Sequence, residues 1–305
     1  MEHTLATSGD GSNTLQLTRF NETYHSKNGA YTEATHIYIR CGLEYLFEKG
    51  LQRGSGTFTS NATPAAGINI FDVGLGTALN CILAWCWQQQ LILAGKPFPQ
   101  IAYYGIEKYP IPSQEALQMN YPQVIAEHMK ILPDSISEAF TKMDRDLSYN
   151  DLQSNTPAPC NSSEAWRILH TGDITFAFEK IHTCGWEKDV EITPGFTLHK
   201  SCADISLLKG DYYSAGKYSG YPAMIFYDTF SPATQPELWD ESIFRSIACS
   251  CTPGSVLTTY CSKGTVKQAL RNAGFTLERL SGPPGKRHIL RGVVRDMTLG
   301  CEIGM

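Results

Sequence analysis

Short apolar runs bounded by glycine, proline and polar residues recur along the chain and predict strands that alternate with helices. The clearest case begins with the apolar run INIFDV at 68–73, which leads into two glycines spaced one residue apart. The segment from Thr77 to Leu93 is apolar and free of Gly and Pro, which predicts a helix, and QIAYYGIE at 100–107 predicts the next strand. A strand, a glycine turn, a helix and a strand together form a βαβ unit.

The remaining pattern extends this unit into a larger sheet. Further strands are predicted for THIYI, GFTLHKSCAD, PAMIFYD and SVLTTYC, at 35–39, 195–204, 222–228 and 255–261. KGTVKQALRNAG predicts a helix that stops at Gly274, and FTLERLSGPPGKRHILRGVV predicts a terminal hairpin around a Gly/Pro turn. The stretch 113–195 is longer than a crossover needs and predicts inserted helices and loops, among them a helix in SEAFTKMDRDL. Alternating βα units that finish in an antiparallel hairpin indicate a three-layer α/β sandwich with one reversed strand.

Length and composition fit one large domain with an insertion. With 305 residues and 42% hydrophobic content, the chain can bury a full core. The polar start MEHTLATSGDGSNT lacks the basic and apolar regions of a signal peptide, and CILAWCWQQQLILAG is interrupted by glutamines and does not read as a membrane span. We therefore expect a soluble, cytoplasmic protein with no membrane partner.

Charge and cysteine content narrow the function only slightly. The formal net charge of −5 does not indicate a nucleic-acid binder, although local basic patches rather than the total decide such affinity. Ten cysteines are scattered along the chain, and Cys249 and Cys251 are one residue apart, too close for the CxxC spacing of zinc or redox sites. We expect reduced, structural thiols and no metal site.

The turn DVGLG at 72–76 has the features of a ligand-binding strand-to-helix turn. Glycines let the backbone approach a ligand closely, and a helix N-terminus offers free N–H groups. A dinucleotide fingerprint needs a small third residue where this chain has Leu79, and an acid before the glycines would repel a pyrophosphate. The same acid, Asp72, suits the cationic end of S-adenosylmethionine, which indicates a methyltransferase. The alternative is a plain strand-to-helix turn.

Acids also end two of the other predicted strands. Glu107 closes the strand after the glycine turn, a position where an acid accepts hydrogen bonds from both ribose hydroxyls in doubly wound folds. The alternative is a solvated acid beside Lys108. By the same logic Asp204, at the end of the strand at 195–204, could bond an adenine amino group.

The segment YDTFSPATQPELW at 227–239 places an acid at a strand end, with an aromatic residue and a proline at fixed offsets after it. Asp228 would lie at the carboxyl edge of the sheet, where ligands bind in open α/β folds. Its carboxylate can accept hydrogen bonds from a substrate amine and orient the lone pair toward a methyl donor; a structural turn cap is the alternative. Phe230 and Pro232 would wall the pocket, and Trp239 is expected mainly in the core.

Four segments together resemble the methyltransferase domain of the bacterial tRNA 5-methylaminomethyl-(2-thio)uridine biosynthesis enzymes. They are DGSNTLQLTRFNETYHSKNGAYTEATHIYIRCGL, FDVGLGTALN, YDTFSPATQPELW and AGFTLERLSGPPGKRHILRGV, in the family's order. The resemblance implies a class I, Rossmann-like α/β fold with a seven-stranded, mostly parallel sheet and a C-terminal antiparallel hairpin. It also implies an N-terminal extension, 1–60, that contributes to the active site, and a methyltransferase domain, 61–305, that carries the insertion.

The resemblance implies transfer of a methyl group from S-adenosylmethionine to the amine of 5-aminomethyl-(2-thio)uridine at the tRNA wobble position. The implied cofactor contacts are Asp72, Gly74, Gly76, Asn80, Glu107 and Asp204, and Asp228 would lie near the reacting amine. Tyr24, His25 and Ser26 match a family segment close to the active site. The chain departs from the family pattern at Leu75, Ala78 and Gln235, where the family has Phe, Gly and Asn.

The implied partner is the tRNA anticodon region. The candidate phosphate contacts are Lys286, Arg287, His288 and Arg291 in the final hairpin, together with Lys263, Lys267 and Arg271; an ordinary solvated face is the alternative. A splayed-out wobble base could stack on Tyr24, Phe230 or Trp239.

Some family members fuse this domain to a flavin oxidase that prepares the amine. Because the chain ends at residue 305, we expect a stand-alone methyltransferase served by a separate oxidoreductase or modification complex. Two rival functions stay open: a class I methyltransferase that acts on a different amine, and a non-catalytic α/β binding protein.

Overall fold

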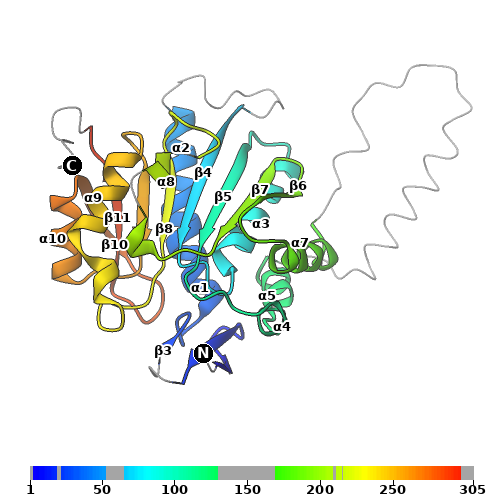
Figure 1. Ribbon diagram of the computed structural model, residues 1–305. Coiled ribbons are helices and arrows are strands. Elements are labelled where there is room, and N and C mark those ends of the chain that lie inside the picture. The colour runs from blue at the N-terminus through cyan, green and yellow to red at the C-terminus, as the bar shows by residue number, and fades with distance from the viewer. Residues whose placement is uncertain are drawn as a thin grey trace, which may run out of the picture.

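The computed structural model describes residues 3–18, 22–52, 65–129, 169–208, 211–214 and 216–296. Across these residues an eight-stranded sheet runs through the molecule in the order β10-β11-β9-β8-β4-β5-β7-β6 (Figure 1). Its strands are β4 (Ala65–Val73), β5 (Pro99–Ile106), β6 (Asp189–Thr193), β7 (Phe196–Ser201), β8 (Met224–Tyr227), β9 (Val256–Thr259), β10 (Phe275–Ser281) and β11 (His288–Val294).

The five central strands are parallel and the edges are antiparallel. Strand β4 pairs in parallel with β5 on one side and β8 on the other, and β7 and β9 extend the parallel sheet outward. The chain therefore winds in opposite directions from β4, which creates a topological switch point between β4 and β8. In open α/β sheets ligands bind at the carboxyl ends of the strands beside such a point.

Helices cover both faces of the sheet, as the sequence pattern predicts. On β4, Ile68 and Ile70 pack into one buried cluster and Phe71 and Val73 into another, because neighbouring strand residues point to opposite faces. The first cluster includes residues of α3 (Leu79–Leu93), α5 (Tyr121–His128), α7 (Thr171–Thr183) and the helix that runs through α1 (Ala30–Ala34), a π-helical stretch (Thr35–Glu44) and α2 (Tyr45–Gln52). The second includes residues of α8 (Asp211–Ser214), a 3-10 turn (Pro236–Trp239), α9 (Glu241–Ser250) and α10 (Gly264–Asn272).

A small antiparallel sheet forms the N-terminal part of the described chain. It contains β1 (His3–Thr7), β2 (Asn13–Leu17) and β3 (Glu22–Thr23) and lies at one end of the molecule (Figure 1). The Asn120 side chain ties it to the segment between α4 (Ser113–Ala116) and α5, because its Oδ1 accepts from Asn13 N at 2.7 Å and its Nδ2 donates to Gly11 O.

The α/β fold class and the C-terminal hairpin are confirmed, but three expectations were wrong. The segment at 35–39 is helical rather than a strand. The described sheet has an additional antiparallel edge strand, β6, within the stretch predicted to be helices and loops. Cys249 is disulfide-bonded rather than reduced.

One predicted helix, SEAFTKMDRDL, lies outside the described residues. In the described part of the chain, no helix is both long and apolar enough to span a bilayer.

Candidate active site

The register of the sheet brings three predicted site residues to one edge. Val73 of β4 is aligned with Tyr227 of β8 and with Ile106 of β5. The residues that follow, Gly74, Asp228 and Glu107, therefore leave the sheet side by side. Backbone hydrogen bonds hold the ends of these strands together: Gly74 N donates to Ile106 O at 3.1 Å, and Asp228 N donates to Val73 O at 3.1 Å.

A cavity of about 290 Å³ opens at this edge. Its lining includes seven predicted site residues from five separate segments, namely Tyr24, Gly74, Gly76, Glu107, Asp204, Asp228 and Phe230. The lining contains several acids and little positive charge, with Lys108 as its one cation among the described residues. An acidic, partly aromatic cavity suits a cationic, hydroxyl-rich ligand better than a phosphate.

The glycine turn has a backbone that only small residues can follow. Gly74 has φ +101°, and a Cβ placed on it would lie 2.6 Å from the carbonyl oxygen of Asp228. Gly76 has φ +49°, and its Cβ would press on the Tyr24 ring at 3.0 Å. Ala78, where the family has glycine, keeps the left-handed conformation with φ +56°. Glycine at 74 thus lets the two strand exits touch beside the cavity.

Two buried carboxyl groups flank Asn80. Asn80 Nδ2 donates to Asp228 Oδ2 at 2.9 Å, and the Tyr103 hydroxyl donates to Asp72 Oδ2 at 2.5 Å. Burial raises the pKa of Asp72 well above its usual range, and the neighbouring charge of Asp228 adds to the rise. Burial also raises the pKa of Asp228, while the hydrogen bond from Asn80 opposes the rise. Asp72 is fully buried and does not line the cavity, so it acts on the cavity only through its neighbours.

Glu107 is tied to the glycine turn. Its Oε2 accepts from Gly76 N at 3.1 Å and its Oε1 accepts from Tyr109 N at 2.9 Å. Burial raises the pKa of Glu107, and these backbone hydrogen bonds oppose the rise. An ionised carboxylate has about four lone-pair sites, so acceptor capacity for a ligand hydroxyl remains beyond the backbone bonds from Gly76, Tyr109 and Lys108.

Asp204 follows β7 and is paired with a lysine. Lys108 Nζ lies 2.6 Å from Asp204 Oδ2, and Asp204 Oδ1 accepts from Ser206 N at 3.0 Å. The hydrogen bond from Lys108 lowers the pKa of Asp204, so this carboxyl is ionised at neutral pH. An adenine amino group would have to share this oxygen pair with Lys108.

Aromatic residues close the acceptor side of the cavity. Tyr24 packs edge-on against Phe230 with ring centroids 5.1 Å apart, and both line the cavity. Pro232 is not in the lining, and Trp239 is a core residue that is 6% exposed and donates from Nε1 to Phe230 O at 2.8 Å. The expected core position of Trp239 is thereby confirmed.

His25 lies behind this wall rather than in it. Its Nε2 is 2.7 Å from Thr77 Oγ1, which in turn is 2.7 Å from the Tyr121 hydroxyl. Burial lowers the pKa of His25 to about 4. The neighbouring Ser26 accepts a hydrogen bond from Asn28 N and is also outside the lining.

Several further lining residues were not predicted as site residues from the sequence. They are Leu17, Lys108, Tyr109, Ile205, Thr229, Thr234, Gln235, Glu237 and Leu238. Lys108 and Tyr109 directly follow Glu107, so their place after a strand end was the available clue. Leu17 reaches the cavity from the N-terminal sheet, a contact that no local pattern encodes. Among the described residues, no cluster of three or more His, Cys, Asp or Glu could hold a metal ion.

The structure separates the predicted tRNA contacts into engaged and free cations. Arg291 is 11% exposed in its side chain, pairs with Glu278 at 2.5 Å and stacks on Tyr45. Lys286 pairs with Glu33. Arg287 and Lys263 are exposed. Engaged cations contribute little to phosphate binding without breaking those contacts.

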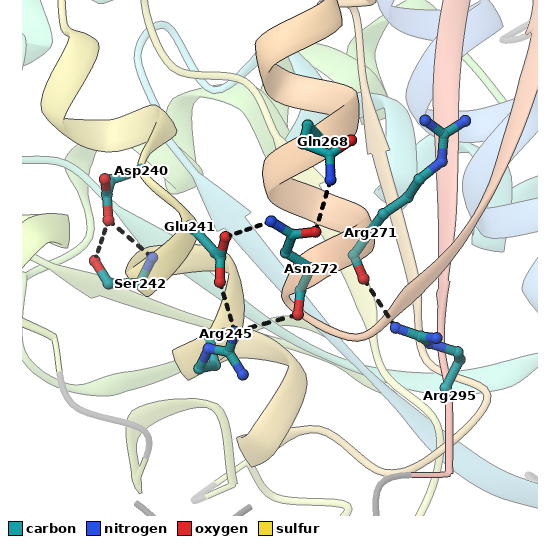
Figure 2. A network of polar contacts seen from close by, with 8 residues as sticks. All are labelled: Asp240, Glu241, Ser242, Arg245, Gln268, Arg271, Asn272 and Arg295. Atoms are coloured by element: carbon teal, nitrogen blue, oxygen red, sulfur yellow. Dashed lines mark hydrogen bonds and ion pairs between the residues drawn. The ribbon is translucent and has the colours of Figure 1, made fainter. Parts of the chain in front are cut away.

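The surface of α9 and α10 also carries both engaged and free cations (Figure 2). Arg245 is held by Glu241 at 2.5 Å and donates to Asn272 O. Arg271 takes part only through its carbonyl, which accepts from Arg295, and its guanidinium points away from the network. The exposed Arg271 side chain is therefore available to meet a phosphate, in keeping with its predicted role.

Comparisons with known proteins support the family resemblance. Residues 186–295 match a family model described as S-adenosyl-L-methionine-dependent methyltransferase. The tRNA 5-methylaminomethyl-2-thiouridine biosynthesis bifunctional protein MnmC of Burkholderia mallei (strain SAVP1) is 25% identical over 276 residues, which are 90% of this chain and 33% of that protein. Its counterpart from Burkholderia pseudomallei (strain K96243) is 26% identical over 279 residues. The chain spans about a third of the length of these curated relatives.

A solved structure confirms the fold. The crystal structure of MNMC2 from Aquifex Aeolicus superposes with a TM-score of 0.57 at 19% identity, covering 97% of this chain and 73% of that one. The chain therefore shares the fold of that structure, and the resemblance inferred from its motifs is confirmed.

Proposed function

We propose that this chain, an S-adenosylmethionine-dependent methyltransferase by sequence similarity and fold, N-methylates the aminomethyl group of 5-aminomethyl-(2-thio)uridine at the tRNA wobble position. The observation that carries the proposal is the meeting of Gly74, Glu107 and Asp228 around one cavity at the switch point. The printed function of the relatives supplies the acceptor.

The residues present fit S-adenosylmethionine. Glu107 has free acceptor sites for ribose hydroxyls, and Asp204 lies on the same rim for an adenine amino group. Gly74 and Gly76 line the cavity where the methionine part would lie, and the buried Asp72 carboxyl lies behind them. Asn80 contacts the site through Asp228. Bound there, the cofactor would supply an electrophilic methyl group on a sulfonium, which acidic surroundings stabilise.

Asp228 would hold the acceptor. Its Oδ2 is oriented by Asn80 at 2.9 Å, and its carboxyl faces the cavity. A carboxylate there accepts hydrogen bonds from the amine and aims the nitrogen lone pair, and it can take the proton that the amine must lose. Tyr24 and Phe230 would flank the extruded base, since enzymes that act on a base remove it from its stack. His25 and Pro232 would support this wall from behind.

The tRNA would approach over the exposed cations. Arg287, Lys263 and Arg271 are the candidates for phosphate contacts, with His288 and Lys267 on the same elements. A tRNA substrate implies a cytoplasmic reaction, and the primary amine implies a separate oxidoreductase or modification complex that prepares it. In domain terms, residues 1–60 would form an extension that completes the site and 61–305 the catalytic unit.

A transfer assay separates this function from its rivals. The chain is incubated with methyl-labelled S-adenosylmethionine and either tRNA that carries the aminomethyl group or tRNA that lacks it. Label on the first tRNA alone supports the proposal. Label on neither tRNA, with cofactor binding intact by calorimetry, would point to another amine; absence of cofactor binding would point to a non-catalytic scaffold. The similarity to methyltransferases does not favour either rival.

A further inference from the structure

The turn between β10 and β11 directs its two basic residues to different places. In the sequence GPPGKR, Arg287 is exposed, whereas the Lys286 side chain is 27% exposed. A Cβ on Gly282 would lie 2.2 Å from Lys286 O, and a Cβ on Gly285, at φ +87°, would lie 2.0 Å from the Asn28 side chain. The glycines thus let this turn pack closely on the N-terminal segment, where Lys286 reaches Glu33 and the Tyr260 ring.

Lys286 is held by two residues from separate elements. Its Nζ lies 2.6 Å from Glu33 Oε2, whose side chain is 12% exposed, and 4.4 Å from the centre of the Tyr260 ring. The Tyr260 hydroxyl donates at 2.9 Å to the carbonyl oxygen of Thr229, the residue directly after Asp228. An ion pair and a cation–π contact in a poorly hydrated place fix the ammonium more firmly than a surface ion pair would.

The charged and titratable groups around Lys286 come from every element packed against it. They are Glu33 on α1, His25 after β3, Asp228 after β8, and Tyr260 and Cys261 after β9; Tyr38 of the π-helical stretch hydrogen-bonds Asp228. Burial raises the pKa of Asp228, and the positive charge of Lys286 opposes that rise. On the neighbouring His25, Glu33 raises the pKa and Lys286 lowers it, so the pair acts with opposite signs there. Lys286 therefore contributes positive potential at Asp228, in addition to the hydrogen bonds from Tyr38 and Asn80.

We propose that Lys286, held by Glu33 and Tyr260 beside Asp228, is an electrostatic positioning residue that keeps the acceptor amine unprotonated for methyl transfer. This inference rests on the proposed function and deepens it. An ammonium has no lone pair, so the acceptor must be neutral when it attacks. A fixed cation behind the cavity wall, near Asp228, disfavours the protonated form of an amine held by this carboxyl, and it also favours the ionised form of Asp228 as the hydrogen-bond acceptor. The two effects have the same sign, because a positive charge lowers the pKa of every titratable group near it.

The test is the pH dependence of single-turnover methylation with saturating cofactor and tRNA. Lys286→Met should move the acid limb of the rate profile to higher pH by about half a unit or more. Lys286→Arg keeps the charge and should leave the limb in place. Glu33→Gln leaves the cation uncompensated and should move the limb to lower pH. Arg279→Met removes an exposed cation from the same hairpin and should not shift the profile.

The alternative role for Lys286 is a plain phosphate contact. In that case Lys286→Met would raise the KM for tRNA and lower its salt dependence while the acid limb stays where it was, and the inference would be overturned. Calorimetric cofactor affinity and the melting temperature show whether Lys286→Met is folded. If Lys286→Met does not fold, the other two variants decide. An acid limb that moves to lower pH in Glu33→Gln but stays in place in Lys286→Arg supports the inference. An acid limb that stays in place in Glu33→Gln overturns it. Absence of product from the wild-type chain overturns the proposed function itself.

Discussion

Asp228→Asn changes one charge in the site and little of its shape. The native carboxylate accepts from Asn80 Nδ2 at 2.9 Å, and an asparagine at 228 can still offer its carbonyl oxygen to the same donor. The substitution also removes repulsion from the buried Asp72. We therefore expect the variant to fold with a melting temperature no lower than that of the wild type.

The loss of catalysis should be large. The amide at 228 can neither take the proton of the amine nor offer two acceptor oxygens to it, so positioning and proton acceptance fail together. Such contributions are worth about 10²- to 10⁴-fold in rate, or about 3–5 kcal/mol of transition-state stabilisation. Cofactor affinity should change by less than about threefold, because Glu107 and Asp204 remain in place.

The assay is single-turnover methylation of tRNA at saturating cofactor, with cofactor affinity measured by calorimetry. Asp240→Asn is the matched control: Asp240 is an exposed helix cap on the same segment, it accepts from Ser242 N at 2.9 Å, and asparagine caps a helix equally well. The control should match the wild type in rate and stability. A rate for Asp228→Asn within threefold of the wild type would refute the assigned role.

Four further outcomes are expected. Glu107→Gln should weaken cofactor binding about tenfold by calorimetry with little change in the saturated rate, because one charged acceptor is lost. Gly74→Ala should lower the free energy of unfolding by about 2 kcal/mol or more in denaturant titrations and should abolish cofactor binding. The reason is that Gly74 has φ +101°, and a Cβ at this position would lie 2.6 Å from Asp228 O. Burial lowers the pKa of His25 to about 4, so between pH 6.5 and pH 4 the unfolded chain binds a proton at this residue that the folded chain does not. The free energy of unfolding therefore falls as the pH falls through this window. His25→Gln should remove up to about 3 kcal/mol of that fall, measured by thermal melts at several pH values. Arg287→Gln should weaken tRNA binding and reduce the slope of log affinity against log salt by about 0.9, which an unchanged slope would contradict.

The site was predictable from sequence where strand ends carry polar residues. The runs at 68–73, 100–107 and 222–228 each end in a glycine turn or an acid, and the parallel register places those ends together. Chain order and the parallel-sheet rule therefore suffice for Gly74, Glu107 and Asp228. They do not show that Asp72 lies behind the cavity, because that depends on side-chain packing with Tyr103.

The helix at 35–39 shows why some elements were predicted wrongly from the sequence. THIYI alternates like a strand, yet Ile37, Tyr38 and Ile39 are all buried, whereas His36, Arg40 and Glu44, spaced four residues apart, are half-buried or exposed; this helical period extends beyond the five residues that alternate. Gly42 reads as a helix breaker in sequence, but a Cβ there would lie 2.6 Å from Met224 Cε, so glycine allows the helix to approach the sheet. Long-range contacts such as Lys286 with Glu33 likewise have no local signature.

The measurement that tests the central claim most directly is mass-spectrometric nucleoside analysis of tRNA treated with this chain and S-adenosylmethionine. The account predicts that 5-aminomethyl-(2-thio)uridine disappears and that its N-methylated product appears in equal amount, with the added methyl group on the aminomethyl nitrogen. Persistence of the amine, or a methyl group on any other position, in a preparation that binds the cofactor would contradict it.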